Sequence, residues 1–199
     1  MRLDHLVIGC GDLDEGVAWA EAQLGVALLP GGRHERFGTH NRLLRLGDLY
    51  LEVIAIEPGA SCAGPRWFGL DGFEGAPRLI TWVCAVPDLD AAMVLAPDGK
   101  GHAVPVTRGE LNWRITVPED GCLPMDGAYP TLIQWGDGVV TPPERLADSG
   151  LRLDRLTVRH PEGERIAGLL PLTDSRVRFE TGALAISARL TGPAGEITL

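Results

Sequence analysis

Two ionisable residues stand out because each interrupts a run of apolar residues. His5 lies within Leu3–Gly9 and Glu52 lies within Leu49–Ile56, and both segments are rich in branched side chains. An unpaired carboxylate in apolar surroundings is costly, so Glu52 must be paired, bound to a cation, exposed or protonated. His5 and Glu52 are therefore our candidate catalytic residues. The alternative is that an arginine satisfies Glu52 and that His5 is simply hydrogen-bonded.

A second group of polar residues follows a pair of glycines. Segment 31–34 ends in His34, and segment 38–41 places His40 and Asn41 at the start of a strand-like run. Binding residues concentrate on loops and strand ends. We therefore expect His40 and Asn41 to bind substrate and His34 to face solvent. The alternative is that the glycines set turns and the polar side chains cap strand ends.

Three tryptophans occupy strand-like segments in the middle of the chain: Trp82, Trp113 and Trp135. A curved sheet could direct some of these rings into a shared cavity, where aromatic side chains commonly line ligand pockets. We take Trp82 and Trp113 as candidate substrate-binding residues. The alternative is that they are core residues, which is the commoner role of aromatic side chains in strands.

The elements that must position these residues form a repeated pattern. Residues 1–57 predict a βαβββ module, with a helix that begins near Asp12 and stops at Gly25, followed by strands at 36–40, 41–46 and 49–56. Segment 58–77 is rich in glycine and proline and predicts a linker or covering loop. Residues 78–138 repeat the pattern, with strands at 79–86, 112–117 and 130–135.

A smaller third unit is expected over residues 151–199. The segment Leu153–Val158 matches the opening strand of the chain, but Arg155 stands where His5 stands in the first module. We expect this unit to have a structural role, such as covering a sheet edge.

Composition excludes several classes of protein. The net charge of −9 argues against nucleic-acid binding, because lysine and arginine supply most of that affinity. No apolar run approaches the roughly 18 residues of a membrane span, so we expect no membrane association and a cytoplasmic location. The four cysteines are widely spaced and predict neither a zinc finger nor a redox motif.

Segments 3–25, 31–58 and 79–92 together resemble the glyoxalase-like domain of the vicinal oxygen chelate superfamily. The resemblance implies an α+β fold in which paired βαβββ modules form a curved mixed sheet around a cavity. It also implies a divalent metal held by the first and last strands of each module. At those positions this chain has His5, Glu52 and Gln134, with Thr81 as a poor fourth ligand and His40 as a further candidate. The cofactor would be Zn, Ni, Mn or Fe, or none at all.

Two functions are compatible with this resemblance. One is metal-assisted lyase, isomerase or dioxygenase chemistry on a small oxygenated metabolite, with a nearby base that moves a proton. The alternative is a metal-free protein that binds a small molecule in the same cavity. Paired modules often associate through sheet edges, so a homodimer is a further expectation.

Overall fold

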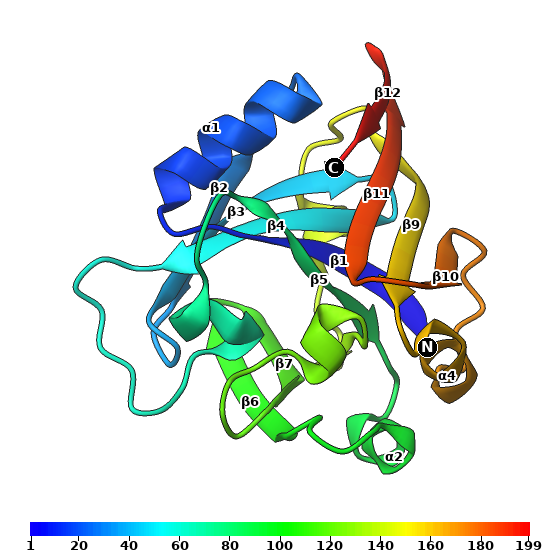
Figure 1. Cartoon of the computed structure of the whole chain (residues 1–199). Coiled ribbons are helices and arrows are strands. Elements are labelled where there is room, and N and C mark those ends of the chain that lie inside the picture. Colours follow the sequence, from blue (N-terminus) through cyan, green and yellow to red (C-terminus); the bar gives the residue numbers. More distant parts are fainter.

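Eight strands form one strongly curved sheet, and four more form a second, smaller sheet beside it (Figure 1). The structure is a computed structural model that describes all 199 residues. None of its helices is long and apolar enough to cross a membrane. The predicted α+β fold class, with paired βαβββ modules around a cavity, is confirmed.

The first module supplies half of the curved sheet. Its elements are β1 (Arg2–Gly9), α1 (Leu13–Leu24), β2 (Leu29–His34), β3 (Thr39–Leu46) and β4 (Leu49–Ile56). The side chain of Asp12 caps α1 by accepting a hydrogen bond from the Glu15 N–H, and Gly25 ends the helix with a left-handed φ of 69°.

One boundary of the first module differs from the expectation. The strand predicted at 36–40 begins earlier, as β2, and residues 35–38 form the turn into β3. Gly31 and Gly32 therefore lie inside a strand and not in a turn. A Cβ atom on Gly31 would come within 2.1 Å of Asn41 Oδ1, and one on Gly32 within 2.8 Å of Arg108 Cδ. These glycines admit two side chains that would otherwise clash with the strand.

The second module follows a loop that contains η1 (Trp67–Gly72). Its elements are β5 (Arg78–Ala85), α2 (Leu89–Leu95), β6 (His102–Arg108), β7 (Leu111–Val117), η2 (Pro124–Gly127) and β8 (Thr131–Trp135). Strand β6 has no counterpart among the strands that we located individually in the sequence. It pairs with β7 across the two-residue turn at Gly109 and Glu110.

The strand order is β2-β3-β4-β1-β5-β8-β7-β6. The first module forms one half of the sheet and the second module the other half, and their first strands, β1 and β5, are neighbours. Strands β1 and β5 pair antiparallel at the centre, with Leu6 opposite Trp82. The two outer strands approach each other: His34 of β2 lies 3.1 Å from Arg108 of β6, and Arg36, in the turn after β2, donates to the Pro105 carbonyl at 3.4 Å. The curved sheet is thus almost closed along a seam between β2 and β6, and its concave face encloses a cavity.

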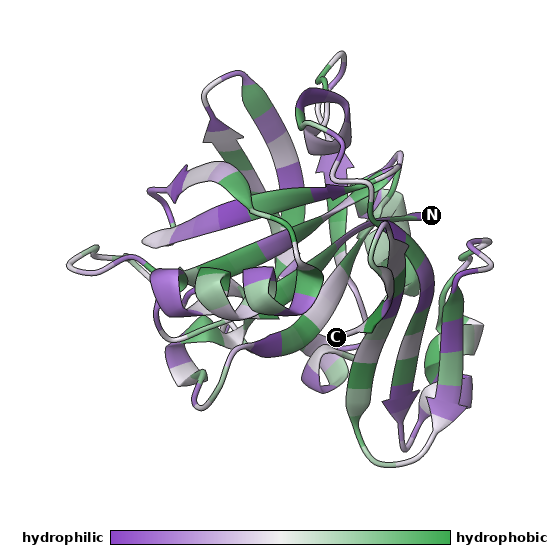
Figure 2. Cartoon of the chain, turned by 90° about the horizontal axis from the view of Figure 1, so that it is seen from above, coloured by the Kyte–Doolittle hydropathy of each residue, from purple (hydrophilic) through white to green (hydrophobic).

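The third unit packs against the convex side of the curved sheet, which is its outer face. After α3 (Pro142–Arg145) it comprises β9 (Arg152–His160), α4 (Gly163–Leu169), β10 (Val177–Thr181), β11 (Ala185–Gly192) and β12 (Gly195–Thr198). Its elements follow the βαβββ order along the chain, but its strand order, β10-β9-β11-β12, differs from that of the first two modules. Apolar residues alternate with polar ones along its strands (Figure 2).

Two apolar cores result from this arrangement. The larger joins the outer face of the curved sheet to the third unit, and the rings of Trp82 and Phe179 lie 6.0 Å apart within it. The smaller core lies on the concave face and includes Trp67, Phe68 and Trp113. The alternation of each strand therefore sorts its side chains between a structural core and the cavity.

Candidate active site

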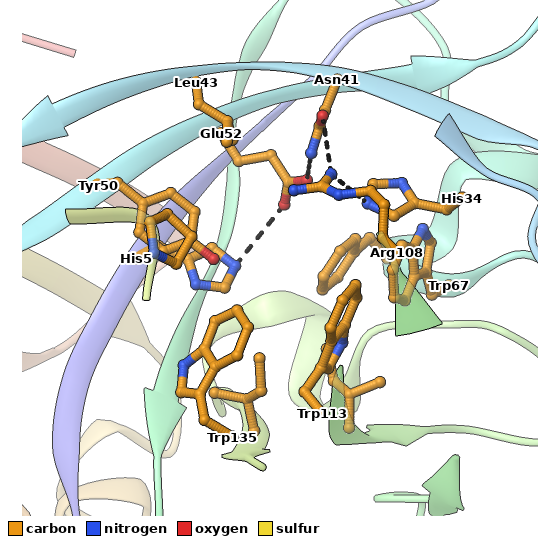
Figure 3. A pocket seen from close by; sticks show the side chains of 14 residues that line it. His5, His34, Asn41, Leu43, Tyr50, Glu52, Trp67, Arg108, Trp113 and Trp135 are labelled. Atoms are coloured by element: carbon orange, nitrogen blue, oxygen red, sulfur yellow. Dashed lines mark hydrogen bonds and ion pairs between the residues drawn. The ribbon is translucent and has the colours of Figure 1, made fainter. Parts of the chain in front are cut away.

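A small cavity of about 30 Å³ lies inside the concave face of the curved sheet (Figure 3). Both modules and the η1 segment contribute to its walls. The lining side chains are those of His5, His34, Asn41, Leu43, Tyr50, Glu52, Trp67, Phe68, Arg108, Trp113, Ile115, Ile133, Trp135 and Pro142.

Glu52 is the acidic group that lines this cavity. Its side chain projects from β4 and the residue is only 5% exposed. The amide of Asn41 donates a hydrogen bond to Glu52 Oε1 at 2.5 Å, whereas Oε2 accepts no hydrogen bond from the protein. Oε2 instead faces His5 Nε2 at 3.7 Å, which is too long for a direct hydrogen bond. One oxygen of a buried carboxylate side chain is thus left free to act on a bound molecule.

The imidazole of His5 is fixed by its neighbour in the sequence. Asp4 Oδ1 lies 2.7 Å from His5 Nδ1, and Asp4 Oδ2 accepts a hydrogen bond from Trp135 Nε1 at 3.0 Å. Adjacent strand residues usually point to opposite faces, but β1 has a bulge between Leu3 and His5, at Asp4. Because an ionised Asp4 can only accept, His5 carries its hydrogen on Nδ1 and presents Nε2 to Glu52.

Tyr50 supports the same imidazole from its other side. The two rings stack with their centroids 4.3 Å apart and their planes 18° apart. Burial raises the pKa of Tyr50 well above its ordinary value, so its hydroxyl stays protonated at neutral pH. Tyr50 therefore contributes packing and orientation to the site rather than a charge.

Arg108 places a guanidinium group in the cavity wall. Its Nη1 lies 3.3 Å from Asn41 Oδ1 and 3.1 Å from His34 Nε2, and no carboxylate forms an ion pair with it. Asn41 thus bridges Arg108 and Glu52 through the two ends of one carboxamide. The sequence reasoning missed Arg108 because β6 was not located. The available signal was Val104, Val106 and Arg108 at alternate positions before a Gly-containing turn.

His34 is buried, and the expectation that it faces solvent is wrong. It is 4% exposed, and it packs edge-on against Trp67. Burial, with a contribution from Arg108, lowers the pKa of His34 from 6.5 to about 3. Its Nδ1 lies 3.1 Å from the Thr39 hydroxyl oxygen. Since Arg108 can only donate, His34 Nε2 must be the acceptor, and the imidazole is neutral.

The predicted substrate-binding residues divide into two groups. Asn41 and Trp113 line the cavity. His40 does not, because the alternation of β3 turns it to the opposite face from Asn41, and its buried Nε2 has no hydrogen-bond partner. Trp82 also lies on the outer face, where its Nε1 donates to the Ala128 carbonyl at 3.2 Å. The assignments of His40 and Trp82 to the cavity are therefore corrected.

The predicted metal ligands fit poorly. His5 and Glu52 lie side by side, but Gln134 faces away from the cavity, and its Oε1 accepts a hydrogen bond from the Leu89 N–H at 3.0 Å. Gln134 therefore helps to cap α2 and is not brought to the other two residues. No group of three His, Cys, Asp or Glu side chains is arranged to hold a metal ion.

The approximate twofold relation between the modules shows which residues of the second module stand where metal ligands would be expected. Val7 pairs with Glu52 in the first module, and Val83 pairs with Thr131 in the second. Thr131 is therefore the counterpart of Glu52, and Thr81 is the counterpart of His5. Hydroxyls replace both ligands of the second module, and a guanidinium lies one carboxamide away from Glu52. These residues do not fit a divalent ion with three protein ligands.

The chain matches the family model described as "Glyoxalase-like domain" over residues 3–173. It therefore belongs to the glyoxalase-like domain family, and the resemblance to the glyoxalase-like domain is confirmed. No curated protein matches the sequence.

Several solved structures are similar to this chain. A hypothetical protein from Staphylococcus aureus is 14% identical with a TM-score of 0.58, and the match covers 84% of this chain and 72% of that one. Methylmalonyl-CoA epimerase from Mycobacterium tuberculosis is 24% identical with a TM-score of 0.44, over 67% of this chain and 85% of the epimerase. The Streptomyces coelicolor enzyme, as its E43L variant, is 20% identical with a TM-score of 0.47, over 71% and 99%. A shared fold does not carry an activity.

Proposed function

We propose that this protein is an acid–base enzyme that moves a proton on a small carbonyl compound, with Glu52 as the base. The observation that carries the proposal is the Oε2 atom of the buried Glu52 side chain, which accepts no hydrogen bond from the protein and faces His5 Nε2 at 3.7 Å. Buried ionisable groups that face each other in a cavity are typical of sites that transfer protons.

The proposed step is balanced without a metal or a redox partner. Glu52 Oε2 takes a proton from the carbon next to the carbonyl, and the C–H electron pair moves into the carbonyl to give an enolate. Arg108 lies one carboxamide away from Glu52, and its positive charge stabilises the anion that develops in the cavity. The proton then returns to the opposite face of the same carbon or to another carbon, either directly from Glu52 or after Glu52 passes it to His5 Nε2, which makes the reaction an isomerisation.

Hydrogen exchange in D₂O tests this proposal. Hydroxyacetone, dihydroxyacetone, pyruvate and phenylpyruvate are incubated with the protein, and NMR follows the loss of carbon-bound hydrogen. We expect enzyme-dependent exchange on at least one compound, and a decrease of about 100-fold or more for Glu52→Gln. Gln retains an oxygen that can accept from Asn41, so the fold is preserved. Glu180→Gln on the exposed face of β10 serves as the control.

Two outcomes would contradict the proposal. Exchange that is unchanged in Glu52→Gln would remove Glu52 from the reaction. Exchange that is lost with EDTA and restored by Zn, Ni, Mn or Fe would show that a metal carries the chemistry, as the family resemblance first suggested.

A binding function without turnover is the second candidate. The observation that favours it is the aromatic wall formed by Trp67, Trp113 and Trp135, which would suit a planar ligand. Saturable binding of phenylpyruvate with no exchange above the uncatalysed rate would support this function over the enzymatic one.

A further inference from the structure

A second hollow lies outside the curved sheet, along the seam between β2 and β6. It measures about 520 Å³, within the usual range for small-molecule sites. It shares His34 and Arg108 with the inner cavity, so these two side chains form the wall between the groove and Glu52. We call this hollow, lined by residues 33–36 and 105–109, the seam groove.

The charge of the seam groove is opposite to that of the whole chain. The protein carries a formal net charge of −9, yet the groove is lined by Arg33, Arg36 and Arg108 against a single acid, Glu35. Arg33 is engaged by Glu57 at 2.6 Å, whereas Arg36 and Arg108 form no ion pair. A local positive field on an acidic protein attracts anions selectively and raises their association rate.

Arg108 is held ready for an anion. Its acceptors in the fold are the neutral Asn41 and the neutral His34, so its charge is uncompensated by any direct partner. Gly32 makes room for its side chain, because a Cβ there would lie 2.8 Å from Arg108 Cδ. The planar guanidinium matches the two oxygens of a carboxylate, which it binds with paired hydrogen bonds.

The geometry points to a carboxylate subsite at Arg108: the substrate is a small carbonyl compound that bears a carboxylate and enters through the seam groove. This subsite, which rests on the proposed function, also orients the substrate. Asn41 joins Arg108 Nη1 at 3.3 Å and Glu52 Oε1 at 2.5 Å through one carboxamide. A carboxylate on Arg108 is therefore held on the side of the cavity where Asn41 links Arg108 to Glu52.

Calorimetric titration of the whole protein tests the subsite without requiring turnover. The probes are pyruvate and phenylpyruvate, each compared with its uncharged methyl ester. We expect at least one acid to bind at least tenfold more tightly than its ester. We expect Arg108→Gln to weaken the acid at least tenfold and to leave the ester within about twofold. Arg108→Lys should fall between, since lysine keeps the charge but lacks the fork.

Two matched variants separate this inference from its alternatives. Arg114→Gln removes the same charge from β7, where Arg114 pairs with the exposed Asp90 at 2.7 Å, and should leave acid binding unchanged. Glu52→Gln should retain acid binding even though it stops proton exchange. Loss of exchange with intact acid binding would thus support the subsite independently of the reaction.

Three results would overturn the carboxylate subsite. The first is equal binding of acid and ester by the wild type, or no binding of either acid. The second is unchanged acid binding in Arg108→Gln, which would mean that Arg108 serves only to balance the charge of Glu52 through Asn41. The third is inorganic phosphate binding more tightly than both acids, which would assign the groove to a phosphate ligand.

Discussion

At the scale of single residues, the site depends on polar groups whose partners leave one atom free. Asp4 fixes His5 and exposes its Nε2, while Asn41 fixes Glu52 and exposes its Oε2. Side chains held by a second layer of hydrogen bonds lose little freedom when a ligand binds. The neutral His34 likewise accepts a hydrogen bond from Arg108. The neutral state of its imidazole can be tested through the pH dependence of stability.

His34 should make the protein lose stability as the pH falls. Its pKa is lowered by burial to about 3, from 6.5 in an unfolded chain. Between these values the unfolded chain binds a proton that the folded chain does not, so acidification favours unfolding. We expect His34→Gln to reduce the fall in unfolding free energy between pH 7 and pH 5 by about 2 kcal/mol.

Urea unfolding at both pH values gives this difference directly. His102→Gln, at an exposed position on β6, is the control and should leave the pH dependence unchanged. An equal pH dependence in wild type and His34→Gln would contradict the neutral, buried imidazole.

Sequence reasoning found His5, Glu52, Asn41 and Trp113, because polar or aromatic residues inside apolar strands are visible without a structure. It favoured His40 over His34 because His40 and Asn41 lead into a strand, whereas His34 was expected to face solvent. Gly31 and Gly32 lie within β2, and the alternation of β3 sends His40 to the outer face. The pairing of Asp4 with His5 depends on a bulge, which has no distinct sequence signal.

At the scale of elements, the loop between the modules closes one end of the cavity. The η1 segment holds Trp67 and Phe68, and their rings stack with centroids 5.1 Å apart. Phe68 has a φ of 57°, a left-handed conformation that costs a residue with a side chain about 1–2 kcal/mol. The burial of its ring offsets the cost of this strained backbone. Substitutions that remove the ring with and without relief of the strain can therefore separate the two contributions to stability.

At position 68, the glycine variant should be more stable than the alanine variant, which is the reverse of the usual order of stability. Both variants lose the buried ring, at about 3–5 kcal/mol for alanine. Glycine relieves the positive φ, so we expect Phe68→Gly to be more stable than Phe68→Ala by about 1 kcal/mol. At Phe73, where φ is −71°, alanine should instead be the more stable. Chemical unfolding of the four variants measures their free energies of unfolding. The same order of stability for alanine and glycine at both positions would contradict backbone strain at Phe68.

At the scale of the whole molecule, the third unit is joined to the curved sheet by a continuous core. Trp82 is fully buried, and its ring approaches Phe179 of β10 at 6.0 Å. Arg176 adds a polar link, because it pairs with Asp48 in the β3–β4 turn at 2.7 Å and with Asp174. The sequence predicted the three units but not this packing, because contacts between distant segments leave no local pattern.

The chain should therefore unfold as one cooperative unit. We expect a single calorimetric transition with equal calorimetric and van't Hoff enthalpies. Removal of residues 151–199 exposes the outer face around Trp82, so the fragment 1–150 should show no cooperative transition. Two separate transitions in the whole chain, or a cooperatively folded fragment, would show that the third unit is independent. The expected homodimer and cytoplasmic location stay predictions.

The ratio of hydrogen-exchange rates in wild type and Glu52→Gln tests the central claim most directly. The claim is that a buried carboxylate with one free oxygen moves a proton on a bound carbonyl compound. With the hydrogens at C3 of pyruvate or phenylpyruvate as the signal, we predict a ratio of about 100 or more. The Glu180→Gln control should give a ratio near one. A ratio near one for Glu52→Gln would contradict the claim and leave the cavity as a binding site.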